Sequence, residues 1–123
     1  MKKWLFVVTA LFALLIFALV IGANTDQLPG PIDSIYRLPR GDKFGHLILF
    51  GTLSFLLNKS ALALFPKQNP ARLVLTVSLI LSIVIALEEW SQVLFPSRLS
   101  SIKDLIAGYM GVFPAALLAY WTR

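Results

Sequence analysis

The chain of 123 residues is 58% hydrophobic and only 14% charged, and its mean hydropathy is +0.80. Too little polar surface remains to cover a water-soluble domain, so the composition indicates a small integral membrane protein. The net charge of +5 comes from Lys and Arg beside the apolar segments, which is typical of topology signals and phospholipid contacts and argues against a nucleic-acid partner. The absence of cysteine excludes disulfides and thiolate metal sites.

Four apolar segments approach the length of about 20 residues that a helix needs to cross a bilayer. The first follows Met1-Lys2-Lys3 and is longer than the apolar region of about 7 to 15 residues in a secretory signal, so a retained first helix is expected. In chain order, the predicted spans are residues 4–23, 44–65, 73–95 and 105–122.

Turn and cap signals separate these spans. Three prolines and two aspartates between residues 24 and 41 predict an irregular loop, and the two prolines of the segment 66–70 end the second span. Pro96 stops the third span, and Ser101-Ile102-Lys103-Asp104 has the pattern of a capping box that starts the fourth helix near Ile102. Short connections place consecutive helices antiparallel, so the sequence predicts an all-α, up-down bundle of four transmembrane helices.

The distribution of charge predicts how this bundle sits in the membrane. With four spans, the N-terminus, the connection 59–72 and the C-terminus share one side, which carries six of the eleven Lys and Arg and no acidic residue. The other side carries five basic residues and all six acidic ones. Because Lys and Arg favour the cytoplasmic side, the N- and C-termini are expected to be cytoplasmic.

The spans admit polar and ionisable residues at the opposite, extracytoplasmic end. A charged side chain near hydrocarbon costs a few kcal/mol or more unless it is paired or hydrated, so these positions suggest a site. Asp42 and His46 share one helical face, and Glu89 is expected to need a partner such as His46, Lys43 or Arg98. The candidate binding residues are Asp42, Lys43, His46, Glu89, Gln92, Arg98 and Asp104.

The order of these residues resembles one known family. The pattern is Asp42-Lys43-x-x-His46, then Glu89-x-x-Gln92, Arg98, Asp104 and Gly111, and it is similar to that of the VanZ-like bacterial membrane proteins over residues 42–115. The family usually has an Asn where this chain has Gly108.

The resemblance implies a single VanZ-like membrane domain over residues 1–123, located in the inner (cytoplasmic) membrane of a bacterium. The family's namesake is linked to low-level resistance to the glycopeptide teicoplanin, so an antibiotic-resistance role in the cell envelope is the implied function. The family spacing also selects Glu89, whereas helical geometry alone slightly favours Glu88 as the neighbour of Gln92.

Each candidate residue also has a structural explanation. Asp42 is suited to cap the second helix. His46 is expected to be a buried neutral imidazole rather than a metal ligand, because the chain has only one His, and no metal or cofactor is predicted. Glu89 with Gln92 either forms polar contacts that hold two helices together, or serves as a general base or a ligand contact. Arg98 either closes an internal salt bridge or holds an anion.

Two further patterns have structural interpretations. Small residues in the fourth span lie on one stripe with Asp104 and are expected to let another helix approach closely; they are Gly108, Gly111 and Ala115. Aromatic residues near the span ends are expected to anchor the bundle at the membrane interfaces; they are Trp4, Trp90, Tyr120 and Trp121.

Three function classes remain open on the sequence. The favoured one is a non-enzymatic envelope protein whose polar cluster binds a lipid head group or partner. The second is an enzyme acting on a lipid-linked or peptidoglycan-related substrate, with His46 or Glu89 as catalytic acid or base and Arg98 as anion contact. A transporter is disfavoured because ionisable residues at one end provide no polar path across the membrane unless protomers assemble as an oligomer.

Overall fold

The computed structural model describes residues 3–24, 30–31, 41–91, 94 and 102–122; for residues 23–24, 41–44 and 102–104 the description covers the backbone alone. These ranges contain four long helices and no strand. The helices are α1 (Lys3–Asn24), α3 (Gly41–Leu64), α4 (Pro70–Ser91) and α5 (Ile102–Trp121). The predicted all-α class is therefore confirmed.

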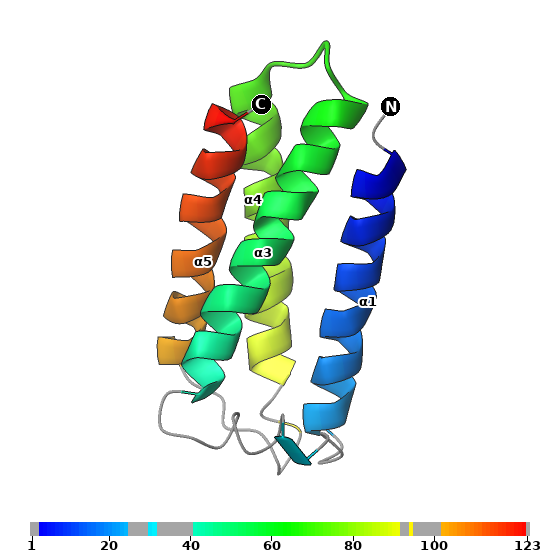
Figure 1. Ribbon diagram of the computed structural model, residues 1–123. Helices are drawn as coiled ribbons and strands as arrows, with labels where there is room; N and C mark the ends of the chain where they lie inside the picture. Colours follow the sequence, from blue (N-terminus) through cyan, green and yellow to red (C-terminus); the bar gives the residue numbers. More distant parts are fainter. Residues whose placement is uncertain (1–2, 25–29, 32–40, 92–93, 95–101, 123) are drawn as a thin grey trace.

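The four helices form an up-down bundle (Figure 1). The start of α1, the connection between α3 and α4, and the end of α5 lie at one end of the molecule, and the other helix ends lie at the opposite end. Helix α3 is central: its most extensive packing is against α5, and it also contacts α4 and α1. This arrangement agrees with the topology expected from the short connections.

Three segments are long and apolar enough to cross a membrane: Lys3–Gly22, Gly45–Leu64 and Pro70–Ser91. The fourth apolar segment, Leu105–Trp121, is shorter. Large hydrophobic side chains remain exposed along the outer faces of all four helices, which is the surface of a protein that faces lipid rather than water. Helix length and surface together are those of a membrane protein.

The boundaries of α4 differ from the prediction. The helix begins at Pro70 rather than near residue 73, because Asn69 caps it: Asn69 Oδ1 accepts hydrogen bonds from the backbone N–H groups of Ala71 (2.9 Å) and Arg72 (3.2 Å). Proline is well suited to the first helical position, since its missing N–H has no partner there in any case. The described helix ends at Ser91, before the predicted end at residue 95, which lies outside the described residues.

Other boundaries agree with the sequence signals. Helix α3 closes before Pro66 and α5 begins at Ile102, as predicted. The side-chain contacts of the capping box itself lie outside the described residues. Of the predicted loop between α1 and α3, only Gly30 and Pro31 are described, and both are helical.

The ends of the bundle carry the residues expected at a membrane interface. Trp4 and Trp121 are exposed at one end, and Trp90 is exposed near the other. Lys59 Nζ reaches the end of α5 and donates a 2.6 Å hydrogen bond to the Thr122 carbonyl. A cation at a helix C-terminus is favourable because it faces the negative end of the helix dipole.

The core lies where α3, α4 and α5 meet, and Ile16 of α1 completes it. Ile85 of α4 and Val112 of α5 are its most deeply buried members, with 1% and 0% of their surface exposed. Three hydrogen bonds between helices surround the core: Ser54 Oγ to the Val112 carbonyl, Tyr109 Oη to the Ser82 carbonyl, and Thr9 Oγ1 with Ser60 Oγ. Hydroxyl groups therefore connect α3 with α5, α5 with α4, and α1 with α3.

Helices α3 and α5 approach most closely at two glycines. A Cβ atom built on Gly111 would overlap the Leu47 carbonyl oxygen and lie 3.0 Å from the Gly51 backbone nitrogen. A Cβ atom on Gly51 would lie 3.3 Å from the Cα atom of Gly111. The close approach expected for the small-residue stripe is confirmed at Gly111, and it explains the extensive α3–α5 contact.

Two fully buried serines provide a matched test of these polar contacts. Ser54 donates a 2.8 Å hydrogen bond across α3 and α5, whereas Ser78 Oγ is buried without a hydrogen-bond partner among the described residues. We expect Ser54→Ala to lower the free energy of unfolding by about 0.5–1.5 kcal/mol, and Ser78→Ala to leave it unchanged or raise it. Denaturant titration in mixed micelles measures the free energy of unfolding of both variants. An equal decrease in the two would contradict the hydrogen-bond assignment.

Candidate functional site

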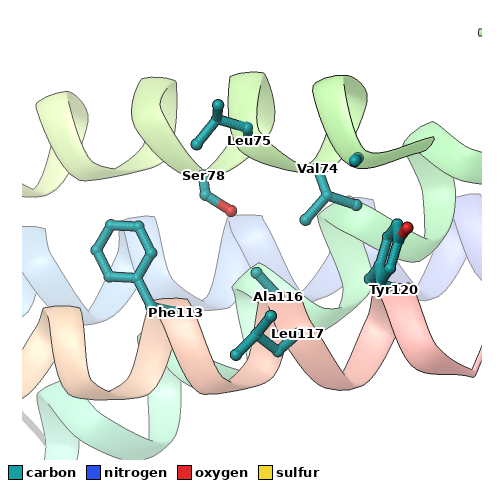
Figure 2. A pocket seen from close by; sticks show the side chains of 8 residues that line it. Val74, Leu75, Ser78, Phe113, Ala116, Leu117 and Tyr120 are labelled. Carbon is teal, nitrogen blue, oxygen red and sulfur yellow. The ribbon is translucent and has the colours of Figure 1, made fainter. Parts of the chain in front are cut away.

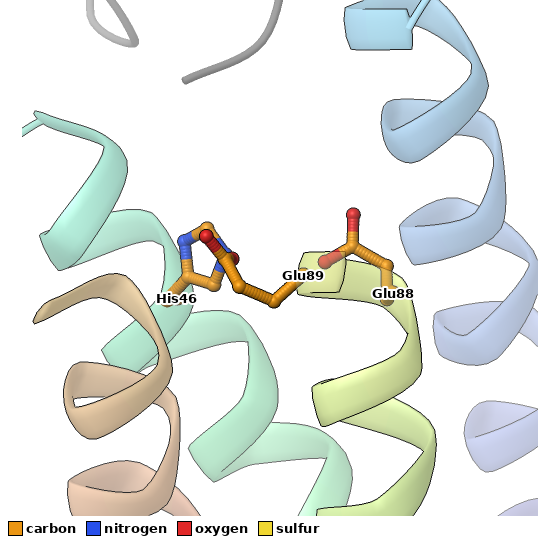
Figure 3. Close-up of side chains that lie close together, drawn as sticks. All are labelled: His46, Glu88 and Glu89. Atoms are coloured by element: carbon orange, nitrogen blue, oxygen red, sulfur yellow. The ribbon is translucent and has the colours of Figure 1, made fainter. Parts of the chain in front are cut away.

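The candidate site lies at the end of the bundle where α3 begins and α4 ends. His46 is five residues into α3, and Glu88 and Glu89 are in the last turn of α4. Because the two helices run antiparallel, these positions come to the same level of the bundle. Figure 3 shows the His46 imidazole and the Glu89 carboxylate pointing toward one another, with Glu88 beside them.

The central contact of the site joins two buried side chains, an imidazole and a carboxylate. His46 Nε2 lies 3.5 Å from Glu89 Oε2, and the two side chains are only 8% and 6% exposed. The separation is longer than the 2.7–3.2 Å of an ordinary N–H···O hydrogen bond. The Phe50 ring, with its centroid 5.4 Å from that of the imidazole, packs beside His46. His46 is one of the three partners that the sequence suggested for Glu89.

Glu88 was not among the binding residues predicted from the sequence, but the structure places it in the cluster. One ligating atom from each of His46, Glu88 and Glu89 can be chosen so that all three lie within 4.8 Å of one another. Helical geometry had indicated Glu88 and the family pattern had indicated Glu89, and the structure brings both to the imidazole. The two adjacent acidic residues at the end of an apolar segment were a sequence signal from which both glutamates could have been predicted as site residues.

The site is close to the end of the described helix. Glu89 precedes Ser91 by two residues, or about 3 Å of helix rise. The predicted end of this span, residue 95, lies outside the described residues. Glu88 is half-buried, so the cluster is partly exposed at this residue.

The other predicted site residues are described in part or not at all. Asp42 and Lys43 lie in the first turn of α3, and Asp104 lies in the first turn of α5, but only their backbones are described. The first turns of both helices are at the same end of the bundle as His46 (Figure 1). Gln92 and Arg98 lie outside the described residues.

The cluster offers one imidazole and two carboxylates within contact distance. Such groups can exchange a proton, accept hydrogen bonds from a cationic or hydroxylated head group, or ligate a cation. All three have limited access to water at the end of an apolar bundle, where an ionised carboxylate is costly unless a positive charge or hydrogen-bond donors accompany it. The arrangement therefore favours a positively charged group at this place.

A separate apolar pocket lies between α4 and α5, toward the other end of the bundle. Its volume is about 480 Å³, and Figure 2 shows the Ser78 hydroxyl among its mostly apolar side chains. It is lined by Ala71, Val74, Leu75, Ser78, Phe113, Ala116, Leu117 and Tyr120. None of these residues belongs to the cluster around His46, so the pocket is not part of the candidate site.

Comparisons of this chain with protein-family models, with curated proteins and with solved structures found no match. The resemblance to the VanZ-like family therefore rests on the ordered polar residues alone. The geometry of His46, Glu88 and Glu89 is an independent observation, because it does not depend on that resemblance.

Proposed function

We propose that the chain is a VanZ-like protein of the bacterial inner membrane, whose polar cluster lies at the extracytoplasmic face. In this proposal the cluster binds an envelope lipid head group or a partner, and binding changes the sensitivity of the cell to glycopeptide-type agents. The observation that carries the proposal is the buried pair of His46 and Glu89 at one end of the bundle. The termini, at the other end, are then cytoplasmic.

The way in which the helices are joined elsewhere supports a ligand-binding role for this pair. Among the described residues, a hydroxyl group makes a hydrogen bond between α1 and α3, between α3 and α5, and between α4 and α5, and Lys59 adds one at the exposed end of α5. Neutral hydroxyls are cheaper to bury in a membrane protein than ionisable side chains are. A buried pair of ionisable residues is a more expensive way to join α3 and α4 than a hydroxyl group, and this favours a role in binding.

The test is the phenotype of site variants in a bacterial host. Expression of the natural chain is expected to change the inhibitory concentration of teicoplanin, and Glu89→Gln, His46→Ala and Arg98→Ala are expected to abolish that change. Trp90→Phe is the control, because Trp90 is exposed next to Glu89 and outside the cluster. The amount of folded protein in the membrane is measured for each variant by size-exclusion chromatography in detergent.

Two outcomes would contradict the proposal. If the three site variants are all lost from the membrane while Trp90→Phe remains, the cluster has a structural role. If all variants fold and retain the phenotype of the natural chain, the cluster does not mediate it.

The distance of 3.5 Å between His46 Nε2 and Glu89 Oε2 also favours a second candidate function. A buried imidazole beside a carboxylate is an arrangement used in acid–base catalysis, so the chain could act on a lipid-linked or peptidoglycan-related substrate, with Arg98 holding an anionic group. Incubation of the purified protein with envelope lipid extracts, followed by mass spectrometry, separates the two functions. Product that is absent with Glu89→Gln supports the enzyme, whereas saturable binding without product supports the binding protein.

A further inference from the structure

We propose that His46, Glu88 and Glu89 form a binding site for a divalent metal ion of the zinc class. The site takes one imidazole nitrogen and two carboxylate oxygens as ligands, from the start of α3 and the end of α4. This goes beyond the envelope function, because it assigns an inorganic ligand that the function does not require.

The donor set matches the chemistry of Zn²⁺. Zinc binds imidazole nitrogen and carboxylate oxygen, and sites with three protein ligands leave a fourth position for water or another ligand. Calcium and magnesium prefer oxygen ligands alone, so the imidazole favours a transition metal. Glu88 is half-buried, so a fourth ligand could reach the ion beside this residue.

The spacing of the central pair matches the edge of a tetrahedral zinc site. With metal–ligand bonds of about 2.0–2.2 Å, two ligating atoms of a tetrahedron lie about 3.4 Å apart. The observed distance from His46 Nε2 to Glu89 Oε2 is 3.5 Å, so both atoms can contact one ion without movement. The farthest of the three ligating atoms is within 4.8 Å of the others, a gap that rotation of the Glu88 side chain can close.

The charge of the cluster also fits a divalent cation. As ligands of a metal ion, two carboxylates and a neutral imidazole would bring a charge of −2, which one Zn²⁺ ion balances. Glu89 and His46 are both buried, so the ligand atoms that they offer are largely shielded from water. The Phe50 ring packs beside the imidazole, with the two ring centroids 5.4 Å apart.

The single His of the chain is the reason that the sequence alone favoured a neutral imidazole. A zinc site with one His needs two carboxylates from elsewhere, and the sequence-based set of residues included Glu89 without Glu88. Folding supplies the third ligand, because the antiparallel packing of α3 and α4 brings both glutamates to the same imidazole.

The test uses the purified full chain in detergent micelles after treatment with a chelator. Titration with Zn²⁺ against a chromophoric chelator is expected to show one ion per chain. His46→Ala and Glu89→Gln are each expected to lower the affinity at least tenfold, and Trp90→Phe is expected to leave it unchanged. Replacement of Zn²⁺ by Co²⁺ is expected to give the intense visible absorption of a tetrahedral site, which is lost in the same two variants.

Glu89→Gln keeps the shape of the side chain, so it remains informative if His46→Ala does not fold. The absence of stoichiometric binding to the natural chain would overturn the proposal, as would equal affinity in the natural chain and Glu89→Gln. Because the measurement is made on purified protein without an antibiotic, its failure leaves the envelope function standing. Conversely, if the expected change in teicoplanin sensitivity is not observed, the metal site is not contradicted.

Discussion

Gly111→Ala is expected to lower the free energy of unfolding by about 2 kcal/mol or more, which is a large effect for one methyl group. The added Cβ atom would overlap the Leu47 carbonyl oxygen and crowd the backbone of Gly51. Both obstacles are backbone atoms of α3, so no change of side-chain rotamer can relieve them. Helices α3 and α5 must therefore move apart, and the hydrogen bond from Ser54 to the Val112 carbonyl is expected to weaken as well.

Gly45→Ala is the matched control for this substitution. It makes the same chemical change in α3, but a Cβ atom on Gly45 meets nothing within 4 Å. Alanine is the better helix former by about 1 kcal/mol, so Gly45→Ala is expected to be neutral or stabilising. Denaturant titration in mixed micelles, followed by circular dichroism, compares the two variants. Equal stability of both would show that α3 and α5 do not meet at Gly111.

Ile85→Ala is expected to lower the free energy of unfolding by about 2–3 kcal/mol. Ile85 is 1% exposed and lies at the junction of three helices: its Cγ2 atom is 3.4 Å from the position of a Cβ on Gly108, whose other neighbour is Phe50. Lipid is as apolar as this core, so the loss comes from missing packing contacts and from the cavity left behind, with little contribution from transfer out of water.

Ile83→Ala is the control that distinguishes the loss of core packing from the mere loss of apolar surface. Ile83 is on the same helix but is 61% exposed on the outer face, so its truncation removes apolar surface without opening a cavity in the core. We expect it to change the free energy of unfolding by about 0.5 kcal/mol or less. The same titration measures both variants, and a loss for Ile83→Ala as large as that for Ile85→Ala would contradict the packing of α4 described here.

The contact at Gly111 and the core residue Ile85 both lie close in the chain or in space to residues of the candidate site. Leu47, which Gly111 meets, directly follows His46 in α3, and Ile85 is one helical turn before Glu88 and Glu89 in α4. The close packing of α3, α4 and α5 therefore fixes the relative positions of the imidazole and the carboxylates. Variants that loosen this packing are expected to weaken metal binding as well as stability.

The polar cluster was only partly predictable from the sequence. The expected approach of His46 to Glu89 is present, and the first turns of α3 and α5 bring Asp42, Lys43 and Asp104 to the same end of the bundle. From the sequence, helical geometry slightly favours Glu88 as the neighbour of Gln92 and the family spacing selects Glu89, so neither argument includes both glutamates. The presence of both beside the imidazole depends on how α4 is rotated about its axis.

The sequence by itself determined the class of the protein, the presence of the four long helices that the structure describes and most of their ends. Long apolar segments determine helices of membrane length, and the turn and cap residues before α5 and after α3 determine where these helices begin and end. The short connections determine that neighbouring helices are antiparallel. Each of these features depends on residues that are close together in the chain.

Only the tertiary structure decided which face of each helix points inward. In a water-soluble bundle an apolar face marks the inner side of a helix, but here the outer face is apolar as well and the inner face mixes apolar residues with small polar ones. The rotation of the helices is decided instead by close packing, through Gly51 against Gly111 and through Ile85 in the core. That packing brings both glutamates to the imidazole of His46 and so creates the candidate metal site.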